Sequence, residues 1–365
     1  MDLDALSVRD IYGSDPLAHL LLGRWRLRPW VIALISLLVG VCYMGGLAAA
    51  FGYFRPRPGT VASQSDIFNQ LNFFIVFPVA MFYYLWQPAK IVQVYDAVCY
   101  HVQARDETAV SLLQAIRRLN AHPGWWLPGV FVCLLGMTVG VYDSFSTLGI
   151  WWYAANWLMV AVLQLVRGII FYALIVVVAR HLATTVGLNR LYARFPIPVR
   201  VLPITHAGGI QTVGQYAFSF TAAAAVVGIN LGTVPILSTR IAVDYPFQVL
   251  AYFLLAPLGF FLPLLQAHSH MAQNRNRVLD GLAAQFQAEY TRLLRLVADN
   301  DQEAAESLAR LKIIQETYEW TRKSPTWPFD TSTLYRLGAT IVAPFDVTWC
   351  SACSVRLSCV CPRPS

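Results

Sequence analysis

Pro29 to Phe54 reads PWVIALISLLVGVCYMGGLAAAFGYF, 26 residues without an Asp, Glu, Lys or Arg. A helix needs about 20 predominantly apolar residues to cross a bilayer, so this stretch predicts a membrane span. Five further uncharged stretches, each at least 23 residues long, are residues 67–89, 119–142, 144–166, 201–239 and 245–274. Their repetition along 365 residues predicts an all-α fold, a polytopic transmembrane helix bundle.

The composition supports the same fold class. Hydrophobic residues make up 57% of the chain and charged residues 13%, where soluble domains carry about 25% charged residues. The net charge of +7 does not indicate a nucleic-acid partner, because the basic residues flank apolar stretches instead of sharing one soluble face. The lipid bilayer is the expected partner, and self-association into a homo-oligomer is left open.

The expected bundle covers residues 29–269, with six spans near residues 30–53, 70–88, 124–143, 154–180, 214–237 and 246–268. Residues 325–346 predict an elbow and a partial seventh helix, whose apolar segment is too short to span alone. Residues 347–365 form an atypical Cys-rich tail with the spacing C-x2-C-x5-C-x-C, which matches no common structural zinc pattern. A frameshifted gene end is one explanation for this tail.

Lys and Arg concentrate on the cytoplasmic side of membrane proteins. One side of the predicted topology carries Arg24, Arg26, Arg28, Lys90, Arg105, Arg117, Arg118, Arg180, Arg190, Arg194, Arg200, Arg275 and Arg277. The opposite loops carry Arg55, Arg57 and Arg240. This asymmetry predicts a cytoplasmic N-terminal segment, residues 1–28, and a place in a bacterial inner (plasma) membrane.

Residues 270–324 predict a cytoplasmic amphipathic helical hairpin. Its first apolar face recurs at steps of three and four residues: Leu279, Leu282, Phe286, Tyr290, Leu293 and Val297. The second face comprises Leu308, Leu311, Ile314 and Tyr318. One long bent helix is the alternative. Residues 275–323 are the expected surface for a cytoplasmic protein partner.

The fourth predicted span carries a charge at its middle, Arg167. Asn156, Gln164 and Arg167 fall within about 80° of one another at 100° per residue, which makes a polar stripe on one helix. Intramembrane ions mark substrate or ion paths by default, so these three residues form the candidate path. The structural alternative is a hydrogen bond, for example from Arg167 to Asn230 in the fifth span.

A second candidate site precedes the fifth span. His206, Gly208 and Gly209, with Arg200 adding charge, suit contact with an anion or a lipid headgroup. Glycines let backbone amides approach a ligand closely, and a helix N-terminus favours negative charge. A loop-to-helix turn without a ligand is the structural alternative.

No catalytic residue, metal or other cofactor is expected. The histidines at one predicted membrane depth are His181, His206, His268 and His270. They lack an H-E-x-x-H pair, and no convergent cluster of His and acid can be assembled for an enzyme. Gly136 and Gly140 form a GxxxG in the third span, which predicts close helix packing, by default within the chain.

Three landmarks carry a family resemblance: His206-Ala-Gly-Gly209, Phe261-Leu-Pro-Leu-Leu-Gln-Ala-His268 and Pro325-Thr-Trp-Pro-Phe-Asp330. With them, residues 120–345 resemble a group of uncharacterised bacterial multi-pass membrane proteins. The chain departs from that pattern at Ala207, where the family often has His-Pro-Asp, and after Phe345, where a last apolar helix is expected. The group has no established activity, so the resemblance implies architecture alone.

Three functional classes remain, and the third, a membrane enzyme, lacks the convergent His and acid cluster that it would need. A channel-like or transporter-like protein would use the polar path along the fourth span. A membrane-anchored signalling or scaffold protein would act through the helical hairpin. An Arg inside a membrane span is costly and needs an explanation, whereas a hairpin does not, so the channel-like or transporter-like class is favoured. An enzyme is not favoured.

Overall fold

The computed structural model describes residues 7–56, 58–102, 122, 124, 126–146, 148, 150–194, 211–237, 245–298, 303–323, 335 and 338–339. Within these ranges the chain is all-α and contains no strand. Within them, the helices long and apolar enough to cross a membrane are Pro29–Ala50, Ile67–Ala97, Leu127–Ser146, Trp157–Leu191, Thr212–Val234 and Tyr245–Leu265. The chain is a multi-pass membrane protein, and the predicted bundle of six spans is confirmed.

The N-terminal segment contains α1 (Val8–Tyr12), α2 (Pro16–Ala18) and the π-helix η1 (His19–Arg24). The first span is α3 (Pro29–Val41), continued by η2 (Cys42–Leu47) and α4 (Ala48–Ala50). After η3 (Ser63–Ser65), the second span consists of α5 (Ile67–Leu71), η4 (Asn72–Val76) and α6 (Phe77–Val102). The later elements are α8 (Leu127–Ser146), η6 (Trp152–Ala155), α9 (Trp157–Arg194), α10 (Gln211–Leu237), α11 (Tyr245–Ala298) and α12 (Ala304–Lys323).

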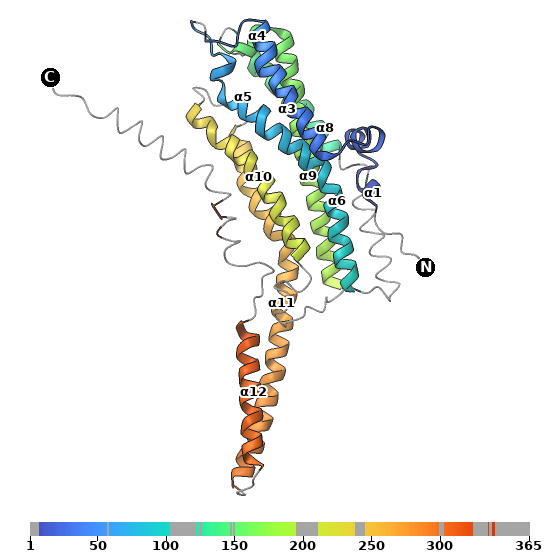
Figure 1. Cartoon of the computed structure of the whole chain (residues 1–365), viewed down its shortest axis with the longest axis vertical. Helices are drawn as coiled ribbons and strands as arrows, with labels where there is room; N and C mark the ends of the chain where they lie inside the picture. Colours follow the sequence, from blue (N-terminus) through green and yellow to red (C-terminus); the bar gives the residue numbers. More distant parts are fainter. Residues whose placement is uncertain are drawn as a thin grey trace, which may run out of the picture.

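The longest element is α11, one unbroken helix of 54 residues and thus about 81 Å long at 1.5 Å per residue. Its first part is the sixth span, its second part leaves the bundle, and α12 folds back along that part (Figure 1). We call α11 beyond Leu265, together with α12, the stalk, so that the bundle has a stalk end and an opposite end. The predicted boundary at residues 269–270 therefore falls inside a continuous helix.

Two contacts fix the direction of α12 in the stalk. Arg292 donates to Glu303 at 3.1 Å and Ser307 donates to Glu289 at 2.9 Å, so residue numbers rise on one helix as they fall on the other. The antiparallel hairpin is confirmed, and the alternative of one bent helix is wrong. The less exposed stalk positions, 279, 282, 286, 289, 293 and 296 on α11 and 304, 307, 311, 314, 318 and 321 on α12, follow the heptad spacing of a coiled coil.

Glycines bring the spans together as two close helix pairs. In the α8–α9 pair, a Cβ on Gly136 would lie 2.7 Å from the Phe171 ring, and a Cβ on Gly140 would overlap the Gln164 amide. In the α10–α11 pair, Tyr252 fills the space beside Gly228 in the same way. The GxxxG in α8 therefore serves packing within the chain.

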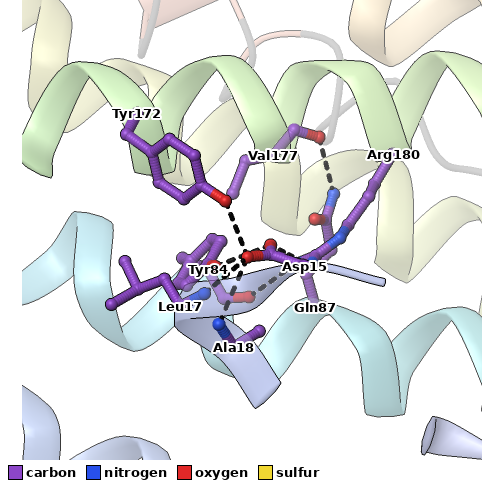
Figure 2. Close-up of polar contacts among 8 residues, drawn as sticks. All are labelled: Asp15, Leu17, Ala18, Tyr84, Gln87, Tyr172, Val177 and Arg180. Atoms are coloured by element: carbon purple, nitrogen blue, oxygen red, sulfur yellow. Dashed lines mark hydrogen bonds and ion pairs between the residues drawn. The ribbon is translucent and has the colours of Figure 1, made fainter. Parts of the chain in front are cut away.

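Asp15 anchors the N-terminal segment in the bundle (Figure 2). Its carboxylate pairs with Arg180 of α9 at 2.6 Å, and the two side chains are 4% and 3% exposed. It also accepts hydrogen bonds from the hydroxyls of Tyr84 (2.6 Å) and Tyr172 (2.7 Å) and from the first backbone N–H groups of α2. Five donors thus saturate one buried carboxylate, as a buried charge requires.

This cluster corrects two expectations. Arg180 was grouped with the loop charges that follow the fourth span, but α9 continues to Arg194 and buries it. The N-terminal segment is likewise more than a polar leader to the first span, since Ile11, Ala18 and Leu21 belong to the buried core. The predicted elbow at 325–330, the tail at 347–365 and most of the partial seventh helix lie outside the described residues.

Candidate functional site

A polar cavity lies at the opposite end of the bundle from the stalk, where α5, α9 and α11 begin and α8 and α10 end. Its volume is about 180 Å³. We call it the polar chamber; its polar lining residues include Asp66, Asn69, Asn72, Asp143, Ser144, Gln164, Arg167, Asn230 and Gln248. Donors and acceptors from five helices therefore converge in a part of the chain that is otherwise apolar.

Arg167 lies ten residues into α9 and lines the chamber. Its guanidinium lies over the ring of Phe171, 5.5 Å from the centroid. A cation over an aromatic face is stabilised by the ring quadrupole, which favours holding the charge inside a span. Arg167 and Gln164, two residues of the predicted polar stripe, both line this cavity, and their role as a path stays a prediction.

Gln164 and Asn230 bring buried amides to the chamber, being 2% and 6% exposed. The Gln164 amide nitrogen donates to Ser144 at 3.2 Å, and the Asn230 amide nitrogen donates to Asn72 at 2.9 Å. Among the described residues, Gln164 Oε1 and Asn230 Oδ1 have no hydrogen-bond partner. An unsatisfied buried acceptor costs about 1–3 kcal/mol, and both oxygens are enclosed by protein atoms.

Asn156 does not join the other two residues of the predicted path. It precedes α9 in an extended conformation, and its Oδ1 accepts a hydrogen bond from the Leu158 N–H at 2.8 Å. Asn156 is therefore a cap of the first turn of α9 and is not among the residues that line the chamber.

Asp66 is a chamber residue that the sequence reasoning missed. It caps α5 by accepting from the Asn69 backbone (3.1 Å) and side chain (2.7 Å), and it accepts from the Trp152 indole at 3.0 Å. Burial raises the pKa of this carboxyl above its ordinary value, although the three donors oppose the shift. The signal that could have found it is an Asp directly before an apolar helix, which is a preferred N-cap.

Closely packed side chains separate the chamber from the stalk end. This closing layer consists of Gln87, Val177, His181, Tyr216, Phe220 and Gly259. His181 Nε2 donates to the Gly259 carbonyl at 2.7 Å, and its ring stacks on Phe220 with centroids 4.0 Å apart. The layer joins α6, α9, α10 and α11 on the stalk side of the chamber.

His181 also differs from its expected place. The sequence puts it at a membrane boundary, whereas the structure buries it at 1% exposure between three helices. In the described part of the chain, no three His, Cys, Asp or Glu side chains are placed to hold a metal. The second predicted site, formed by Arg200, His206, Gly208 and Gly209, lies outside the described residues.

No protein-family model, curated protein or solved structure matches the chain. The resemblance to the bacterial membrane group therefore stays an expectation. The structure locates the polar chamber, where polar side chains interrupt the apolar bundle.

Proposed function

We propose that this protein is a transport-type membrane protein that binds a ligand with an anionic group and hydrogen-bond donors in the polar chamber. The observation that carries this proposal is Arg167, an ion inside a span that lines a cavity of buried amides. A charge inside a membrane-spanning helix costs several kcal/mol, so it persists where it has a function or a saturating structural role. Arg180 pairs with Asp15 in the core, and Arg167 is a lining residue of the chamber.

The chemistry of the lining residues defines the ligand class. Guanidinium is planar and matches carboxylate and phosphate oxygens. The carboxylates and amides that line the chamber match N–H or O–H donors. A ligand with both kinds of group satisfies the chamber better than a simple anion.

The closing layer favours a transporter over an open channel. The chamber lies on one side of this layer, and His181 bridges α9, α10 and α11 within it. Passage requires these contacts to part, with the α10–α11 pair moving against the α8–α9 pair. Such rocking of one helix group against another is a common way to alternate access.

We further propose that the stalk and the N-terminal segment are cytoplasmic and that the membrane is a bacterial inner membrane. The support is the excess of Lys and Arg on that side of the bundle, including Arg24, Arg190, Arg275 and Arg277. The chamber then faces the opposite leaflet. We also propose, from the three sequence landmarks, that the chain belongs to the uncharacterised bacterial group.

The test uses sn-glycero-3-phosphoethanolamine, a soluble probe with a phosphate, hydroxyls and an ammonium group. The full chain is reconstituted in liposomes, and uptake of labelled probe is compared for wild type, Arg167→Ala and the stalk variant Arg277→Ala. We expect uptake above that of empty liposomes, lost in Arg167→Ala and kept in Arg277→Ala. Equal uptake by the two variants would remove Arg167 from the mechanism.

A second candidate function is docking of a cytoplasmic protein on the stalk. The observation in its favour is a set of exposed apolar side chains there, with Ile313 at 63%, Trp320 at 73% and Val297 at 59% exposure. Large exposed apolar groups often mark interaction surfaces. Proteins captured with wild type are compared with those captured after Trp320→Ala and Ile313→Ala, and an unchanged set contradicts docking at these residues.

A further inference from the structure

A second and larger cavity lies next to the polar chamber. We call it the apolar cleft: it separates the α8–α9 pair from the α10–α11 pair, and its volume is about 440 Å³. Val79, Leu135, Ile175, Ala224 and Leu255 are representative of its walls. This size falls in the range of about 300–1,000 Å³ that is typical of ligand pockets.

The chamber and the cleft adjoin each other. Phe171, Leu174, Val227 and Leu231 line both of them. One molecule can therefore occupy both cavities at once, with a polar part beside Arg167 and an apolar part between the helix pairs.

The order of the two cavities matches the order of a lipid in a bilayer. The chamber is bounded by residues at the ends of spans, such as Asp66 before α5, Ser144 near the end of α8 and Tyr245 at the start of α11. The cleft is bounded by residues nearer the middle of the same spans, such as Leu135 and Ile175. A lipid likewise has its head at the membrane surface and its chains towards the midplane.

We infer that the ligand is a glycerophospholipid-type amphiphile whose headgroup carries a hydrogen-bond donor. Its phosphate lies at Arg167, its donor groups face the acceptor side chains that line the chamber, and its acyl chain fills the cleft. This inference rests on the proposed function and narrows the ligand from a polar solute to a lipid.

Other ligand classes satisfy only half of the site. A soluble solute would leave the apolar cleft filled with water, and the hydration of apolar surface is unfavourable. A hydrocarbon without a headgroup leaves the polar side chains of the chamber facing apolar groups. An amphiphile satisfies both, and the shared wall at Phe171 and Leu174 brings its two parts together.

The test measures lipid binding to the purified full chain in detergent, by native mass spectrometry at a series of lipid concentrations. The probes are dioleoyl phosphatidylethanolamine, dioleoyl phosphatidylcholine, whose head lacks an N–H donor, and soluble sn-glycero-3-phosphoethanolamine. Arg167→Gln changes the chamber. Ala224→Phe fills the cleft, and Ala222→Phe is its matched control, because Ala222 is exposed on the same helix and does not line the cleft.

We expect phosphatidylethanolamine to bind at least tenfold more tightly than either other probe. Arg167→Gln and Ala224→Phe should each weaken its binding at least tenfold, and Ala222→Phe should leave it unchanged. If Ala224→Phe elutes as an aggregate, Ala251→Phe on the α11 wall replaces it.

Three results would overturn the inference in different ways. Equal retention of lipid by every variant means annular lipid only. Soluble probe that binds as tightly as the lipid, lost in Arg167→Gln and kept in Ala224→Phe, refutes the lipid and leaves the proposed function standing. Binding of every probe unaffected by Arg167→Gln refutes both.

Discussion

Replacing Asp15 by Ala should unfold the N-terminal segment from the bundle and destabilise the whole chain. Asp15 accepts hydrogen bonds from Tyr84, Tyr172, Arg180 and two backbone N–H groups, and its removal leaves the Arg180 guanidinium buried without its carboxylate. Figure 2 shows how completely these donors surround it.

The magnitude follows from the burial of the pair. With side chains 3% and 4% exposed, neither charge is solvated by water, and removing one partner of such a pair typically costs about 3–5 kcal/mol. A change of 1.4 kcal/mol is tenfold, so the unfolding equilibrium should shift by roughly two to three and a half powers of ten. The double variant Asp15→Ala/Arg180→Met should recover part of this loss, because it leaves no buried charge.

The assay is an unfolding and refolding titration with SDS in mixed detergent micelles, monitored by tryptophan fluorescence. The control is Glu303→Ala, which removes the carboxylate of an ion pair whose side chains are 50% and 61% exposed. An exposed pair is worth less than about 1 kcal/mol. The reasoning would be refuted if Asp15→Ala lowered the free energy of unfolding as little as the control does. It would also be refuted if the double variant lost as much free energy of unfolding as Asp15→Ala and Arg180→Met lose together.

Three further changes test the packing described above in the same titration or by proteolysis. Gly140→Ala should cost about 1–3 kcal/mol, because its Cβ overlaps the Gln164 amide, and Gln164→Ala in the same chain should restore most of the loss. His181→Phe keeps an aromatic ring in the closing layer but loses the hydrogen bond to the Gly259 carbonyl, and we expect about 1 kcal/mol of destabilisation. Leu311→Ala should make the stalk sensitive to protease, since Leu311 is 5% exposed in the hairpin. The same sensitivity after Lys312→Ala, a change at its exposed neighbour, would show that burial is not the cause.

The spans could be predicted from the sequence because uninterrupted apolar length is a property of the chain itself. The hairpin of α11 and α12 was likewise readable from residues such as Leu282, Leu293 and Leu311 at heptad-like spacing. The continuity of α11 could not be predicted from the sequence, because Pro257 and Pro263 both lie inside it and suggest a break.

The sequence predicted only part of the polar chamber, for a geometric reason. Angular positions at 100° per residue relate Gln164 to Arg167 because both lie within α9. They do not apply to Asn156, which lies before the helix begins at Trp157. Asp15 presents a local signal, an N-cap followed by Pro, but this signal gives no hint of a partner 165 residues later in the chain.

The unbroken course of α11 also makes it a lever. From Gly259 in the closing layer to Ala298 the helix extends roughly 58 Å, and a tilt of about 10° at Gly259 would move its far end by roughly 10 Å. A small change in the separation of the helix pairs inside the membrane is thus magnified at the far end of the stalk (Figure 1). A ligand that changed the separation of the helix pairs would therefore displace the far end of the stalk.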